Sequence, residues 1–144
     1  MKKRLIVFLA VAILYSQKST QNQLSVNFWS GLSESEKVSL VNGAYGAISL
    51  LKNYHQHEVR KQYLHDKNWV QPYYIERFYD IADEYRSEEA GYNLKIIVLH
   101  MDALYSNSDN LKIPILEAMR IVSLMQDGDR EKANFRLIQA QRKY

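Results

Sequence analysis

The sequence predicts an all-α protein, a compact single-domain bundle of about five helices after an N-terminal signal peptide. Apolar residues recur at spacings of three and four residues along most of the chain, which is the pattern of one buried helical face. Residues that begin and end helices stand at the borders of these segments, and no segment shows the alternation typical of strands. The length of 144 residues suits one domain.

The N-terminus has the features of a secretory signal. Lys2, Lys3 and Arg4 precede ten consecutive apolar residues, 5–14. Such a run matches the apolar region of a signal peptide and is too short for a membrane-spanning helix of about 20 residues. We therefore expect residues 1–16 to be a signal peptide cleaved near the small residue Ser16, and the protein to be periplasmic or secreted in a bacterial envelope. In the alternative, an uncleaved N-terminus attaches the protein to the membrane.

Charge and cysteine content exclude several classes of protein. The formal net charge is +3, but taking Lys2, Lys3 and Arg4 from the nineteen basic side chains leaves sixteen, which equals the sixteen acidic ones. A nucleic-acid-binding protein needs a basic surplus on one face, so we expect no nucleic acid partner. Because cysteine is absent, the chain has no disulfide, no thiolate chemistry and no lipid anchor through an N-terminal Cys.

The first expected helix follows a polar segment. Residues 17–27 are rich in Gln, Asn and Ser, and we interpret them as a disordered lead-in to a helical domain that spans residues 28–144. Ser33 and Glu36 have the spacing of a capping box, in which each side chain accepts a hydrogen bond from the backbone of the other residue. A helix is therefore expected to begin after Ser33. It either ends near Tyr54 or continues as a solvated extension through the polar residues that follow.

Two glycines, Gly43 and Gly46, lie inside this helix. Each costs about 1 kcal/mol relative to alanine in a helix interior. A missing Cβ permits close approach, so we expect another helix to pack against them. A bound ligand and a flexible or kinked helix are the alternatives.

The remaining expected helices are marked by proline, glycine and aspartate. Pro72 stands near the start of an aromatic segment that ends in the charged run 83–89. The segment 94–125 is the most apolar part of the chain outside the N-terminus, and we interpret it as a core hairpin with a polar loop at 106–110. Gly128 suits a left-handed helix end, and Asp129 suits the N-cap of a last helix.

Six residues are candidates for a structural or a binding role: Gly43, Gly46, Asp102, Tyr105, Asn110 and Pro114. Asp102 lies in the apolar first helix of the hairpin, where a carboxylate needs partners because burying it alone is costly. We expect these partners to be Asn110 or the free N–H groups near Ile113 and Ile115, at the start of the next helix. A ligand-binding role for Asp102 is the alternative.

Motifs for catalysis are weak. His55 and His57 are two positions apart, so on a helix they point about 200° apart and cannot meet one metal ion. Several carboxylates share one helical face and could hold a cation or act as an acid–base pair: Glu76, Asp80 and Asp83 or Glu84. Exposed helices commonly carry such faces. We therefore predict no catalytic residue, no metal and no cofactor.

Tyrosine is abundant, with eleven residues in the chain. Those in the middle of the chain cannot all lie in a core of this size: Tyr73, Tyr74, Tyr79, Tyr85, Tyr92 and Tyr105. Tyrosine offers a large contact area at low entropic cost and is enriched at interfaces, so exposed tyrosines indicate a partner. In the alternative, they are partly buried with solvated hydroxyls.

Several motifs resemble those of small uncharacterised secreted bacterial proteins. The matching residues are Trp29, Leu32, Ser33, Glu36, Lys37, Gly43, Gly46, Leu104, Tyr105, Asn110, Ile113, Pro114, Ile115, Ala118 and Gly128. The layout is also loosely similar to the helical periplasmic immunity proteins that neutralise cell-wall amidase effectors. The resemblance implies a class and a compartment, and it brings no activity with it.

These observations together favour a non-enzymatic protein that binds another macromolecule. The expected partner is a protein of the cell envelope, in the manner of an immunity or inhibitor protein. The alternative is a small periplasmic hydrolase or a ligand-binding module that uses an Asp/Glu and Tyr surface. A binding protein should show a rimmed tyrosine patch, whereas an enzyme should show a cleft with converging carboxylates.

Overall fold

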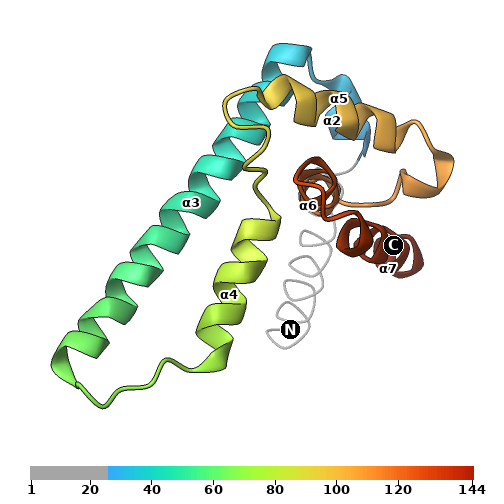
Figure 1. Cartoon of the computed structure of the whole chain (residues 1–144). Coiled ribbons are helices and arrows are strands. Elements are labelled where there is room, and N and C mark those ends of the chain that lie inside the picture. The colour runs from blue at the N-terminus through green and yellow to red at the C-terminus, as the bar shows by residue number, and fades with distance from the viewer. Residues whose placement is uncertain (1–25) are drawn as a thin grey trace, which may run out of the picture.

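The computed structural model describes residues 26–144, which form six α-helices, one short 3-10 helix and no strand (Figure 1). The elements are α2 (Val26–Gly31), α3 (Glu34–His65), α4 (Tyr73–Glu84), α5 (Leu94–Tyr105), η1 (Ser108–Asn110), α6 (Ile115–Gln126) and α7 (Arg130–Lys143). The predicted all-α fold is confirmed. The signal peptide and residues 17–25 of the lead-in lie outside the described residues.

The short helix α2 corrects the expected border of the domain. Val26 and Asn27, which we assigned to the disordered lead-in, form its first turn. The reason is tertiary packing: Trp29 is buried in α2, and Val26 packs against the core. Burial of an indole removes a large apolar area from water, which a local polar composition cannot reveal.

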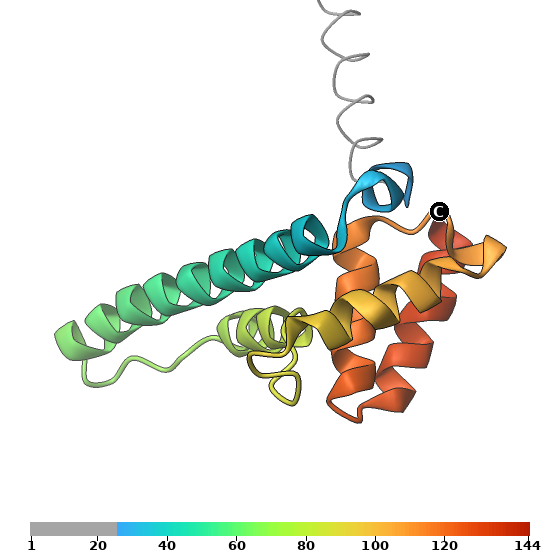
Figure 2. The ribbon, with the colours of Figure 1, turned by 90° about the horizontal axis from the view of Figure 1, so that it is seen from above.

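Helix α6 is the centre of the fold. Eight of its residues are buried: Ile115, Ala118, Met119, Arg120, Ile121, Val122, Ser123 and Leu124. It packs against α4, α5 and α7, so burial extends around most of the helix. Figure 2 shows α5 crossing α6, with α7 running alongside α6. The predicted hairpin of α5 and α6 is therefore confirmed as the core.

Local end signals agree with most helix borders. Ser33 and Glu36 form the predicted capping box, and Asp129 accepts a hydrogen bond from the backbone N–H of Lys132. Pro114 precedes the first residue of α6, where its missing N–H costs nothing. Gly128 adopts a φ of 83°, the left-handed conformation that favours glycine.

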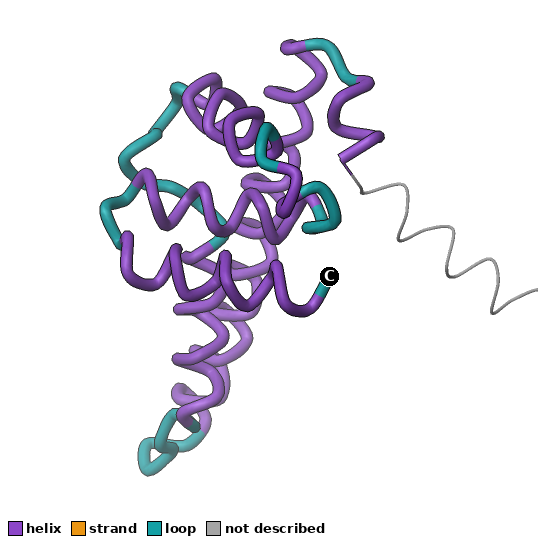
Figure 3. Tube along the Cα trace, turned by 90° about the vertical axis from the view of Figure 1, so that its right-hand side faces the viewer, coloured by secondary structure: helices purple, strands orange, loops and turns teal. Residues whose placement is uncertain are grey.

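The second half of α3 and most of α4 form an arm that projects from the other helices. Helix α3 has 32 residues, so the solvated extension beyond Tyr54 is the correct alternative. At 1.5 Å per residue its length is about 48 Å. Figure 3 shows this arm leaving the remaining helices, with the α3–α4 connection at its far end.

Gly43 and Gly46 do not contact another helix of the described chain, so that expectation is wrong. A Cβ added at either position would meet no atom of the described residues within 4 Å. Both glycines are exposed on α3, whose buried face instead carries Val41 and Tyr45. On a helix, both glycines point away from the buried face of Val41 and Tyr45, and the absence of a Cβ permits a close approach without requiring one.

Candidate functional site

The far end of the arm carries a group of exposed apolar side chains, which we call the arm tip: Tyr63, Leu64, Val70, Tyr73 and Tyr74. Tyr73 is 76% exposed, Tyr74 70% and Val70 83%. Scattered single apolar residues are normal on a protein surface, whereas a group at one projecting end typically marks an interaction site. The six tyrosines that we predicted could not all lie in the core indeed do not: Tyr73 and Tyr74 are exposed, whereas Tyr105 is buried.

A pocket of about 490 Å³ lies beside the arm tip. Its lining residues are Gln56, Val59, Arg60, Tyr63, Trp69, Gln71 and Tyr79. Three aromatic rings therefore surround a space that polar side chains of Gln56, Arg60 and Gln71 also reach. A pocket of this size and composition could accept one side chain or a short segment of a partner.

Aromatic and ionic contacts hold the two helices of the arm together. His55 of α3 lies against Phe78 and Tyr79 of α4, with ring centroids 4.9 and 5.5 Å away. Its Nδ1 is 3.0 Å from the hydroxyl oxygen of Tyr79. Near the base, Lys52 pairs with Asp83 at 2.5 Å. The tip is thus presented on paired helices rather than on a free loop.

The acidic face predicted on α4 does not form a cluster. Asp83 pairs with Lys52 of α3, while Asp80 is 3.9 Å from Arg77 of its own helix. Glu84 turns into the interior, where its side chain is 3% exposed. Because successive positions of a helix point in different directions, the carboxylates are divided among three surroundings. The described part of α4 offers no converging carboxylates for an acid–base pair.

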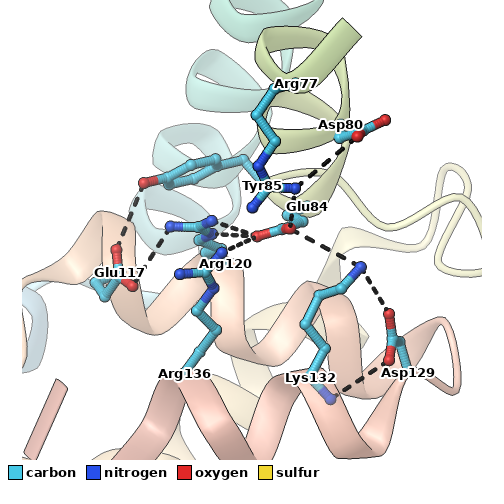
Figure 4. Close-up of polar contacts among 9 residues, drawn as sticks. All are labelled: Arg77, Asp80, Glu84, Tyr85, Glu117, Arg120, Asp129, Lys132 and Arg136. Atoms are coloured by element: carbon cyan, nitrogen blue, oxygen red, sulfur yellow. Dashed lines mark hydrogen bonds and ion pairs between the residues drawn. The ribbon is translucent and has the colours of Figure 1, made fainter. Parts of the chain in front are cut away.

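Glu84 instead lies at the centre of a buried ionic network that joins α4 to α6 and α7 (Figure 4). Its Oε2 accepts hydrogen bonds from Nε of Arg120 at 2.8 Å and from Nη2 of Arg136 at 3.2 Å. Arg77 and Lys132 approach Oε1 at 3.9 and 3.8 Å, and Oε1 accepts no hydrogen bond from the described residues.

Three outer carboxylates balance the cations of this network: Asp80, Glu117 and Asp129. Arg120 also lies 5.0 Å from the ring centroid of Tyr85, a cation–π contact. Four cations therefore meet four carboxylates, and the network neutralises its own charge. This arrangement explains how a charged group is tolerated at the base of the arm, and it identifies a structural joint.

Asp102 has partners other than those we expected. It accepts hydrogen bonds from the indole N–H of Trp29 at 2.7 Å and from Nζ of Lys37 at 2.8 Å. It therefore joins α5 to α2 and α3, and not to the start of α6. The side chain of Asp102 points from α5 toward α2 and α3 and not toward the start of α6. It is 44% exposed.

The other hairpin candidates hold the loop between α5 and α6. Buried Asn110 donates to the carbonyl of Leu104 at 2.8 Å and accepts from Nε2 of Gln141 at 2.9 Å. Tyr105 donates to the carbonyl of Ile113 at 2.8 Å, and burial raises the pKa of its hydroxyl. These bonds satisfy polar groups that would otherwise be buried without partners.

A second hollow lies over α6, between α5 and α7. It has a volume of about 520 Å³ and is lined by His100, Ala103, Leu104, Asn107, Asn110, Val122, Met125, Arg130, Asn134 and Leu137. Half of the lining residues are apolar and half are polar. This hollow could not be predicted from the residue pattern, because it depends on how far apart α5 and α7 lie.

No group of three or more His, Asp or Glu side chains in residues 26–144 could hold a metal ion. Over the same residues, no helix is both long and apolar enough to cross a membrane. Comparisons with protein-family models, curated proteins and solved structures found no match. The geometry of the arm tip is therefore the basis for a functional argument.

Trp69 and Tyr63 are candidate binding residues that the sequence analysis missed. Tyr63 stands in a polar stretch, and Trp69 follows the polar residues that end α3. A tryptophan in a connection that packs on no core is the signal that could have identified this end of the molecule.

Proposed function

We propose that this protein is a non-enzymatic, periplasmic or secreted helical protein that binds another protein of the cell envelope through its arm tip. The mode of action is that of an immunity or inhibitor protein, which occupies a surface of its partner. The single observation that carries the proposal is the group of exposed aromatic and aliphatic residues at the projecting end of the arm.

The composition of the arm tip supports a protein partner. Tyrosine and tryptophan are the residues that most often dominate binding energy, especially when they lie close together around a pocket. Tyr63 and Trp69 line the pocket, and Tyr73 and Tyr74 lie at the start of α4 beside it. A projecting aromatic end can enter a cleft of its partner and lose its exposure to water there.

The separation of the tip from the core also supports the proposal. The tip side chains are exposed, so their apolar surface contributes little to folding. Helix pairing through His55 and Tyr79 presents them in one arrangement before binding. Such preorganisation lowers the entropic cost of association.

The test compares binding by the wild type with binding by a tip variant. We expect the protein, expressed from the full-length sequence and immobilised, to capture a defined protein from envelope extract. Replacing Tyr73 and Tyr74 with serine should weaken this capture by about thirtyfold or more, because a central tyrosine commonly contributes about 2 kcal/mol. Both side chains are exposed, so the fold should be retained, as far-UV circular dichroism can verify.

A matched control removes an equally exposed tyrosine elsewhere. Tyr92 is fully exposed between α4 and α5. We expect Tyr92→Ser to bind as the wild type does. Equal capture by the tip variant, or no specific capture by any version of the protein, would exclude the arm tip as the binding surface.

A ligand-binding module is the second candidate function. The hollow of about 520 Å³ over α6 favours it, because this volume suits a small molecule. The alternative of a hydrolase has less support, since the carboxylates of α4 are divided between Lys52, Arg77 and the buried network. A ligand in the hollow would raise the melting temperature, and Ala103→Trp, at an exposed residue of its lining, would abolish that rise.

A further inference from the structure

The outer face of α3 is a second surface, separate from the arm tip. It consists of Glu36, Gly43, Ala47, Leu50, Tyr54 and Lys61, all of which are exposed. Their positions follow steps of three, four or seven residues, which place them on one side of a helix. The opposite side carries the buried residues Val41 and Tyr45. In Figure 2, α4 and α5 lie on one side of α3 only.

This face has large apolar residues in its middle. Leu50 is 53% exposed and Tyr54 64%, and Leu51 beside them is 63% exposed. Gly43 and Ala47 form a shallow strip next to them, and a Cβ at Gly43 would meet open space. Along this line two small residues, Gly43 and Ala47, are followed by two large ones, Leu50 and Tyr54, so one half of the face offers holes and the other half offers knobs.

Opposite charges stand at the two ends of the same face. Glu36 lies in the first turn of α3, and Lys61 lies in its last turns. Both hydrogen bonds that Glu36 accepts from Ser33 end on Oε2, which leaves Oε1 for a cation. Lys61 pairs with Glu58 in an exposed salt bridge, which contributes little to stability. Lys61 can therefore leave Glu58 for another carboxylate at a small cost in free energy.

We propose that the outer face of α3 binds a second copy of this chain, with the two α3 helices antiparallel about a twofold axis between Ala47 and Leu50. In this register, the numbers of two facing residues always add up to the same value, because the helices run in opposite directions about the twofold axis. Tyr54 lies over Gly43 of the second copy, Leu50 over its Ala47, and Lys61 beside its Glu36.

The antiparallel direction follows from the charges and the sizes. In a parallel pair, Lys61 would face Lys61 and Glu36 would face Glu36, and like charges at such positions destabilise a helix pair. The antiparallel pair brings opposite charges together at both ends. It also sets each large residue against a small one, which a symmetric interface requires because both copies present the same surface.

The outer face of α3 is complementary to itself, and we therefore propose a second copy of the chain as its partner. The same six residues supply the knob, the hole, the cation and the anion, so no additional partner is needed to match them. A single pair of helices buries less than the roughly 800 Å² per partner of a standard stable interface. We therefore expect a reversible dimer with a dissociation constant in the micromolar range.

Sedimentation equilibrium of the protein expressed from the full-length sequence tests this dimer over a range of concentrations. We expect the wild type to move from the monomer mass toward the dimer mass. The double variant Leu50→Glu with Tyr54→Glu should remain a monomer. Phe135→Glu, at a residue of α7 that is 58% exposed, is the matched control and should dimerise as the wild type does.

Charge reversal tests the register. Lys61→Glu should weaken dimerisation by about tenfold, because it brings acidic residues together at both ends of the helix pair, whereas Lys61→Arg keeps the charge and should dimerise as the wild type does. Gly43→Leu should also abolish the dimer while leaving the monomer folded, since the side chain enters open space in the monomer and the position of Tyr54 in the dimer.

Three results would overturn the proposal. The wild type could remain monomeric at all concentrations, or Leu50→Glu with Tyr54→Glu could dimerise normally. Lys61→Glu could also dimerise as well as the wild type and Lys61→Arg do. The serine variant of Tyr73 and Tyr74 distinguishes this surface from the arm tip, because it should dimerise normally while losing the envelope partner.

Discussion

Replacing Glu84 with alanine should be among the most destabilising changes in the described chain. The substitution removes the carboxylate that Arg120 and Arg136 contact and leaves both guanidinium groups at the joint of α4, α6 and α7. The side chain of Arg120 is only 9% exposed, so water cannot replace the lost partner without a rearrangement. Breaking a buried ion pair by removing one partner costs about 3–5 kcal/mol.

That cost is large against the total stability of a domain. A typical domain unfolds with a free energy of about 5–15 kcal/mol. For a domain of this size, each kcal/mol corresponds to a melting shift of about 4 °C, so Glu84→Ala should lower the melting temperature by roughly 12–20 °C. Glu84→Gln should lose less, because its amide oxygen can still accept from Nε of Arg120.

Thermal and urea unfolding of the wild type, Glu84→Ala and Glu84→Gln measure these differences. Asp80→Ala is the control, since Asp80 is 65% exposed and its contact with Arg77 is long at 3.9 Å. We expect less than about 1 kcal/mol for that control. A loss below about 1 kcal/mol for Glu84→Ala would refute the reasoning, because it would mean that the buried cations find other partners easily.

Three further predictions concern single residues. Asp102→Ala should cost about 1–3 kcal/mol in urea unfolding, because the buried indole N–H of Trp29 loses its acceptor, and Asp102→Asn should recover part of this loss. Gly46→Ala should raise stability by about 0.5–1 kcal/mol, and a decrease would show that a contact exists at that face. Burial raises the pKa of the Tyr105 hydroxyl above about 10, the value in the unfolded chain. The contribution of the neutral hydroxyl to the free energy of unfolding is therefore complete below about pH 10 and is lost as the pH rises further. Tyr105→Phe should therefore lose stability less steeply in urea unfolding between neutral and alkaline pH than the wild type, and parallel curves would contradict this origin.

Helix borders could be predicted because their signals are local. The capping box of Ser33 and Glu36 and the left-handed Gly128 act within a few residues, and each stands where its chemistry predicts. The apolar run that became α6 was also evident, since a helix buried on most sides must be apolar on most sides.

Partners distant in the chain could not be predicted in the same way. Asp102 contacts Trp29, 73 residues earlier, and nothing in the spacing of either residue indicates the other. The choice of Glu84 as the buried carboxylate depends on which side of α4 faces α6. Likewise, the arm tip is exposed because α3 extends beyond the other helices. The polar residues after Tyr54 do not indicate whether the helix continues that far.

The length of α3 makes the arm a lever. From Ser49, which accepts a hydrogen bond from Arg86 at the base, to His65 at the end is about 24 Å along the helix. A tilt of about 5° at the base therefore displaces the far end by about 2 Å, enough to break a hydrogen bond to a partner. The stiffness of the base, set by Lys52 with Asp83 and by the ions around Glu84, thus determines how accurately the aromatic end is positioned. A substitution tens of residues from the tip in sequence could change binding without touching a partner.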